Sequence, residues 1–140
     1  MTTYADIRKM IEENDVEYID VRFTDPRGKL QHLAMCEHAM DEDAFNEGIL
    51  FDGSSIAGWK AINESDMLLV PDMDTAVMDP FTAQPQLIIF CDVKDPITGE
   101  FYSRDPRGTA KKAEQFVKDS GVGTDVFFGP EAEFFMFDDV

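Results

Sequence analysis

Two glutamates near the end of the sequence are spaced for metal chemistry. Glu131 and Glu133 flank one alanine in the stretch VFFGPEAEFFMFDDV, whose composition is typical of a β-strand. In a strand, residues two apart share a face, so both carboxylates would point the same way with their roots about 6.6 Å apart. Such oxygen ligands favour Mg²⁺ or Mn²⁺, and the separation suits two neighbouring cations. On spacing alone, a solvated strand face is the alternative.

A second candidate lies in residues 51–59, FDGSSIAGW, which contain two glycines, two serines and the single tryptophan. Its three large apolar side chains are costly to expose, so we expect this loop to dock against another surface. A serine-nucleophile elbow would need glycine at position 57, where Ala57 stands. Asp52 is left as a general base or a cation-binding carboxylate.

Composition excludes several classes of protein. The 140 residues carry 29 acidic and 12 basic side chains, a formal net charge of −17, which argues against a nucleic-acid or anionic-membrane surface. No apolar run approaches the ~20 residues that span a bilayer. The first twenty residues lack the apolar core of a signal peptide, so we expect a cytoplasmic protein. Its two cysteines, Cys36 and Cys91, are then expected to be buried thiols.

Local patterns predict the elements that must position these candidates. The periodicity predicts a helix over Ala5–Asn14, capped by Thr2 or Thr3, and a strand, tight turn and strand over residues 16–36. Further predictions are a brief helix over 41–47, strands over 67–70 and 86–91, and a helix from Pro106 that stops before Gly121. Residues 126–137 complete the series as an apolar strand. A strand this apolar needs neighbours on both edges. Either it packs into the first unit or, as we expect, the sequence is the N-terminal piece of a longer one.

The combination of stretches is more specific than any one of them. FDGSSIAGWKAINESDMLLVPD resembles the N-terminal signature of glutamine synthetase, in its bacterial type I form, and VFFGPEAEFFMFDD resembles the first metal-ligand strand of that family. VRFTDPRGKLQH is similar to its early hairpin, and the segment from Asp105 to Arg107 is similar to the entry of its catalytic domain. The resemblance covers nearly all of the sequence.

This resemblance implies an α+β fold. It consists of an N-terminal helix over 1–14, a β-grasp domain over 15–100, and the start of an antiparallel-sheet catalytic domain over 105–140. It also implies a homo-oligomer of two stacked hexameric rings, with each active site shared between adjacent subunits.

The resemblance also implies an activity, the ATP-dependent ligation of ammonia to glutamate through γ-glutamyl phosphate. Glu131 would bind the metal nearer the ATP phosphates, and Glu133 the metal nearer the substrate glutamate. Asp52 and Ser55 would lie in the loop presented to the neighbouring subunit, where Asp52 binds ammonium and removes a proton. The cofactors would be Mg²⁺ or Mn²⁺, with ATP as co-substrate, although none of these 140 residues is expected to bind ATP.

Two other functions remain open at this point. One is a related γ-glutamyl ligase that uses an amine other than ammonia, and the other is a free-standing β-grasp binding module without catalysis. For the 140 residues by themselves we expect no glutamine synthesis, because phosphoryl transfer needs positioned phosphates and cationic groups around them.

Overall fold

The computed structural model describes residues 1–59 and 65–140. Residues 60–64, which form the KAINE part of the signature quoted above, lie outside the described residues. Two compact units are present, Met1–Ala110 and Lys111–Val140.

The chain opens with helix α1 (Tyr4–Glu13), as its periodicity predicts. Thr3 caps it: the Thr3 hydroxyl accepts from the backbone N–H of Asp6 at 3.3 Å, and the Asp6 carboxylate accepts from the backbone N–H of Thr3 at 2.8 Å. This reciprocal pair satisfies two amides that would otherwise lack partners at the start of the helix. Ile7 and Ile11 are buried, so one face of α1 belongs to the core.

A hairpin follows, formed by β1 (Tyr18–Thr24) and β2 (Leu30–Cys36), which confirms the predicted strand–turn–strand. Asp25 holds the turn, because its Oδ1 accepts from the backbone N–H groups of Arg27 and Lys29, both at 2.9 Å. Gly28 adopts a φ of 82°, a left-handed conformation that glycine reaches without steric cost.

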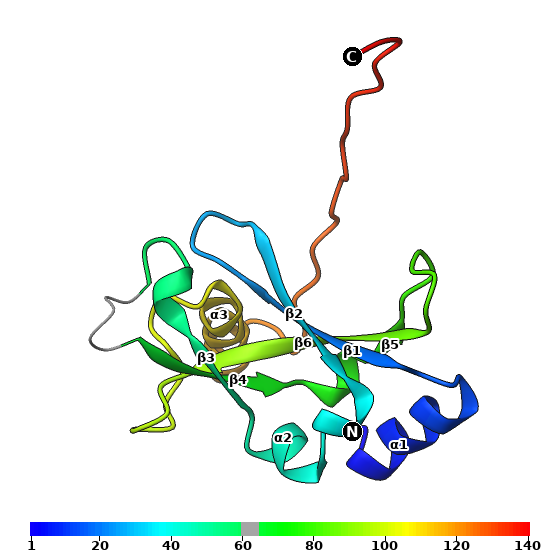
Figure 1. Cartoon of the computed structure of the whole chain (residues 1–140). Coiled ribbons are helices and arrows are strands. Elements are labelled where there is room, and N and C mark those ends of the chain that lie inside the picture. Colours follow the sequence, from blue (N-terminus) through cyan, green and yellow to red (C-terminus); the bar gives the residue numbers. More distant parts are fainter. Residues whose placement is uncertain (60–64) are drawn as a thin grey trace. The chain divides into compact units, whose positions relative to one another are not determined.

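The hairpin joins a mixed six-stranded sheet (Figure 1). Together with the helices, this sheet gives an α+β fold, which confirms the predicted fold class. The remaining elements are β3 (Ile49–Asp52), β4 (Asp66–Pro71), β5 (Val77–Met78), β6 (Gln86–Lys94) and the short helix α2 (Glu42–Asn46). The strand order is β2-β1-β6-β4-β3, and β5 pairs with β6. β1 and β6 are parallel, whereas the other pairs are antiparallel. β3 and β5 were not predicted.

The core lies on the face of the sheet that α1 and α2 cover (Figure 1). It includes alternate residues of the central strands, Ile19, Val21 and Phe23 from β1 and Leu87, Ile89, Cys91 and Val93 from β6. Phe45 of α2 is buried against them. This alternation follows from the two-residue period of a strand, and it makes β1 and β6 the framework of the unit.

The opposite face of β1 contains a polar cluster around Asp20, which is only 1% exposed. Its two carboxylate oxygens contact His32 Nδ1 at 2.7 Å and Arg22 Nε at 2.6 Å. Arg22 also donates to Asp79 at 3.0 Å, so the cluster ties β1 to the segment that precedes β6.

Cys36 lies opposite Tyr18 on this hairpin and is exposed, so the expectation of two buried thiols is wrong for Cys36 and holds for Cys91. The difference arises because β2 is an edge strand of the sheet.

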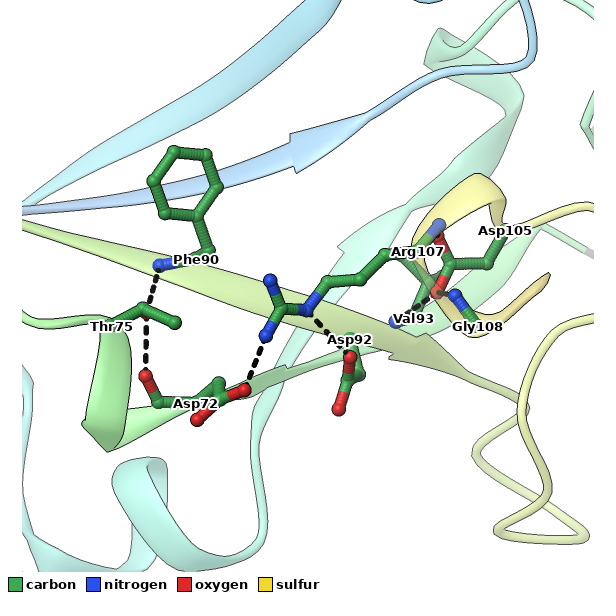
Figure 2. Close-up of polar contacts among 8 residues, drawn as sticks. All are labelled: Asp72, Thr75, Phe90, Asp92, Val93, Asp105, Arg107 and Gly108. Atoms are coloured by element: carbon green, nitrogen blue, oxygen red, sulfur yellow. Dashed lines mark hydrogen bonds and ion pairs between the residues drawn. The ribbon is translucent and has the colours of Figure 1, made fainter. Parts of the chain in front are cut away.

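Helix α3 (Pro106–Ser120) starts at a second polar cluster (Figure 2). Asp105 caps it by accepting from Arg107 and Gly108 backbone N–H groups, both at 3.0 Å, and it also accepts from the Val93 N–H of β6 at 3.2 Å. Arg107 Nε donates to Asp92 at 2.9 Å, and its Nη2 donates to Asp72. The first turn of α3 is thereby joined to β6 and to the segment after β4.

The stretch after α3 departs from the prediction. No strand is assigned between residues 121 and 140, all of which are described, so the expected strand over 126–137 is not formed. A strand needs a hydrogen-bonded neighbour, and the described residues of the Lys111–Val140 unit contain no other strand that could be one. Its phenylalanines are 72–91% exposed; they are Phe127, Phe128, Phe134, Phe135 and Phe137.

Candidate functional site

Asp52 ends strand β3 and caps the 3₁₀ turn Gly53–Ser55 that follows it. Its Oδ1 accepts two hydrogen bonds from Ser54, from the backbone N–H at 2.9 Å and from the hydroxyl at 2.6 Å. These two bonds, with a further one from the Ser65 side chain, hold the pKa of the Asp52 carboxyl below its usual value. An exposed side chain that is anionic at neutral pH can hold a cation.

Ser55 lies in the same 3₁₀ turn and is exposed. Its neighbour Ser54, rather than Ser55, is the residue that contacts the Asp52 carboxylate. Ser54 was not among the predicted site residues. Its contact could have been predicted from the sequence, because an aspartate in a turn commonly accepts a hydrogen bond from the residue two positions further on.

Gly53 fixes the position of Asp52 by a close backbone approach. Its N–H donates to the Ser65 carbonyl at 2.7 Å, and it lies over the start of β4. A Cβ at this position would lie 2.4 Å from Met67 Cγ and 2.9 Å from the Ser65 carbonyl oxygen. Only glycine fits there without a shift of the loop or the strand.

The rest of the loop docks by its apolar side chains. Ile56 and Trp59 are 7% and 5% exposed, and both belong to the core of the unit. The Trp59 ring stacks on Phe23 at a centroid distance of 5.5 Å and meets Phe51 edge-on at 6.0 Å. The expected docking surface is therefore the core of the same chain, which holds the loop that carries Asp52.

Glu131 and Glu133 belong to the other unit, where both side chains are exposed and no strand aligns them. Nowhere in residues 1–59 and 65–140 do three or more His, Cys, Asp or Glu side chains gather in a group that could hold a metal ion. Two carboxylates fall well short of the six oxygen ligands around Mg²⁺. The described residues therefore do not by themselves form a complete metal site, although carboxylates such as these two are suitable ligands for one.

Two family models match the chain. Residues 15–96 match the model of the glutamine synthetase β-grasp domain, and residues 103–140 match the model of the glutamine synthetase catalytic domain. The first match covers more than half of the sequence. The chain belongs to the glutamine synthetase family.

Individual relatives carry the same name. The chain is 64% identical over all 140 residues to glutamine synthetase of Rhizobium meliloti (strain 1021), and 64% identical over 140 residues to that of Bradyrhizobium diazoefficiens. In both cases it spans 30% of the relative's length. Among solved structures it resembles glutamine synthetase of Plasmodium falciparum, with a TM-score of 0.76 and 27% identity over 86% of this chain and 23% of that one.

These matches confirm the resemblance to glutamine synthetase that the sequence motifs indicated. Both motifs that carried it, the Asp52 loop and the Glu131–Glu133 stretch, lie within matched residues. In the part of the chain that the structure describes, no helix is both long and apolar enough to cross a membrane.

Proposed function

We propose that this chain supplies the ammonium-binding loop of a glutamate–ammonia ligase. The observation that carries the proposal is the Asp52 carboxylate, which is exposed, anionic and fixed by Ser54 in a chain of the glutamine synthetase family. The substrates would be glutamate, ammonium and ATP, and the product glutamine. Such an enzyme would act in the cytoplasm, as two stacked hexameric rings with active sites shared between neighbouring subunits.

The chemistry gives Asp52 two tasks. In the first step, a glutamate side-chain oxygen attacks the γ-phosphorus of ATP, giving γ-glutamyl phosphate and ADP. In the second step, nitrogen attacks the acyl carbon and phosphate leaves. Ammonium has no lone pair, so a carboxylate must hold the cation and accept one of its protons before the attack. The Ser54 hydrogen bonds favour the holding of the ammonium cation, because they stabilise the anionic form of Asp52. Ser55 would line the same loop.

Glu131 and Glu133 would each supply one carboxylate to a separate Mg²⁺ or Mn²⁺ ion, with the remaining ligands coming from elsewhere in the enzyme. The support is their spacing in a stretch that matches the catalytic-domain model. When bound, such ions would neutralise charge on the phosphoryl group. When these 140 residues replace the matching part of the Rhizobium meliloti relative, Glu131→Ala and Glu133→Ala should each weaken Mn²⁺ binding or lower its stoichiometry. Unchanged Mn²⁺ binding in both variants would refute these ligand roles.

The decisive experiment uses a hybrid enzyme, in which these 140 residues replace the matching 30% of the Rhizobium meliloti relative. Asp52→Ala in the hybrid should lower ammonium-dependent glutamine synthesis by about 10²-fold or more, because the cation and its proton lose their acceptor. Hydroxylamine serves as the control nucleophile, since it is already neutral at pH 7. Its use should fall much less, and formation of the acyl phosphate should persist. Equal losses with both nucleophiles would refute the role of Asp52.

A further inference from the structure

The loop that carries Asp52 is held at its far end by two side chains from outside it. The Tyr102 hydroxyl donates to the Trp59 carbonyl at 2.9 Å. Arg104 Nη1 donates to the Gly58 carbonyl at 2.6 Å and to the Trp59 carbonyl at 3.3 Å. The Tyr102 and Trp59 rings also meet edge-on, with their centroids 5.6 Å apart. Both carbonyls at the end of this loop therefore accept hydrogen bonds from side chains of one short segment, residues 102–104.

That segment is itself fixed to the sheet. The Tyr102 N–H donates to the Val93 carbonyl of β6 at 2.9 Å, and the Tyr102 carbonyl accepts from the Asp105 N–H at 3.0 Å. Asp105 in turn accepts from the Val93 N–H and caps α3. Tyr102 and Arg104 thus extend from the junction between β6 and the start of α3, a frame set by the central strand of the unit.

A chain of short turns connects Trp59 back to Asp52. The Trp59 N–H donates to the Ile56 carbonyl at 3.2 Å, and the Ile56 N–H donates to the Gly53 carbonyl at 3.1 Å. Gly53 follows Asp52 directly and is pinned to the Ser65 carbonyl. Two successive backbone hydrogen bonds thus connect Trp59 to the residue after Asp52, and through them a displacement at Trp59 would reach the Asp52 carboxylate.

We propose that Tyr102 and Arg104 form a latch that positions the Asp52 loop. They are positioning residues, because they touch the loop backbone at Gly58 and Trp59 and act on Asp52 through it. The consequence for ammonium use rests on the function proposed above. The location of the latch adds a second point: Arg104 lies within the residues that match the catalytic-domain model, whereas the loop lies within those that match the β-grasp model. The latch therefore joins the two matched regions at the site.

The first test needs no activity. In the 140-residue chain, Tyr102→Phe removes one hydrogen bond and keeps the ring, and Arg104→Gln removes the exposed guanidinium. Both should raise the quenching of Trp59, the single tryptophan, by acrylamide, and both should move the Asp52 titration measured by NMR toward an ordinary aspartate. Arg27→Gln, which changes another exposed arginine in the β1–β2 turn, should do neither. Far-UV circular dichroism checks that each variant is folded.

The second test uses the hybrid enzyme. Tyr102→Phe should raise the KM for ammonium by about fivefold, the effect of one neutral hydrogen bond, and Arg104→Gln by at least as much, because the guanidinium donor is charged; the KM for ATP should stay unchanged in both. Arg104→Lys, which keeps a positively charged donor on a long side chain, should recover part of the loss seen with glutamine. Unchanged Trp59 quenching and an unchanged Asp52 titration in both variants would overturn the latch. If the titration moves but even Asp52→Ala leaves ammonium use intact, the latch is supported and the proposed function fails.

Discussion

The Asp52 carboxylate and the Ser54 hydroxyl lie 2.6 Å apart, and the Ser54 backbone N–H reaches the same carboxylate oxygen at 2.9 Å. One residue thus supplies two donors to one acceptor. The pair is local in sequence, so the chain needs no distant contact to form it. It fixes both the direction of the carboxylate and its charge at the point where β3 gives way to a 3₁₀ turn.

Ser54→Ala should raise the pKa of Asp52 toward its ordinary value, because the side-chain hydrogen bond of Ser54 is the largest cause of the depression. A depressed pKa adds stability above the unfolded pKa, and that stability is lost as pH falls through the folded value. Wild type should therefore exceed the variant in stability at neutral pH, with the difference shrinking in acid. NMR titration of the carboxyl carbon and urea unfolding between pH 2 and pH 7 measure this, and Ser55→Ala is the control. An Asp52 titration unmoved by Ser54→Ala would contradict the assignment.

Gly53→Ala should lower the free energy of unfolding by about 1–3 kcal/mol, the usual cost of forcing extra atoms into a packed site. The added Cβ would lie 2.4 Å from Met67 Cγ, so either the loop or β4 must shift. Gly129→Ala is the matched control, since a Cβ there meets nothing within 4 Å. Chemical denaturation of the two variants decides the matter. If Gly53→Ala and Gly129→Ala are equally stable, the loop can move without cost, and the close packing of Gly53 would then not fix Asp52.

Arg107→Leu should destabilise the Met1–Ala110 unit by about 2 kcal/mol, since hydrogen bonds to charged groups contribute about 1.5–3 kcal/mol. The guanidinium links Asp92 of β6 to Asp72, and no aliphatic side chain can replace that link (Figure 2). Arg107→Lys should recover only part of the loss, because an ammonium lacks the planar fork. Lys112→Ala, which changes an exposed cation on α3, is the control for net charge. If the leucine variant matches this control in urea, the cluster does not stabilise the fold.

Local chemistry explains which elements could be predicted. The Thr3 cap, the hairpin turn around Gly28 and the α3 start at Pro106 each depend on residues a few positions apart, and all three could be predicted. β5 contains two residues and β3 four, too few to show a period. Parallel pairing of β1 with β6 joins residues that are far apart in sequence, and no local pattern specifies that register.

In the candidate site, too, the local contacts could be predicted from the sequence and the long-range contacts could not. Asp52 could be chosen from its loop, and its contact with Ser54 follows from a short turn. The contacts from Tyr102 and Arg104 cross 43 and 46 positions, so only the folded chain reveals them. The stretch 126–137 shows the converse. Its composition favours a strand, yet strand formation depends on a hydrogen-bonded neighbour, and residues 121–140, all of them described, contain no strand that could pair with it.

Two phenylalanines should show how little the end of the chain adds to its folded core. Phe45 is 1% exposed and packs between α2 and the sheet, whereas Phe134 is 81% exposed. Phe45→Ala should cost about 3–5 kcal/mol of unfolding free energy, because it leaves a cavity. Phe134→Ala should change that free energy by less than about 0.5 kcal/mol, as surface substitutions usually do. Urea unfolding followed by Trp59 fluorescence measures both.

The same exposure predicts how the end of the chain behaves in solution. Amides of residues 121–140 should exchange with solvent almost without protection, because no strand or helix holds them. Exposed phenylalanines favour association, while the net charge of −17 opposes precipitation, so soluble oligomers should form as concentration rises. Replacing Phe134 and Phe135 by serine should shift sedimentation toward monomer without altering the stability of the core. A wild-type monomer with residues 126–137 protected from exchange would show that this stretch finds a partner within the chain, and the serine variant would then lose core stability as well.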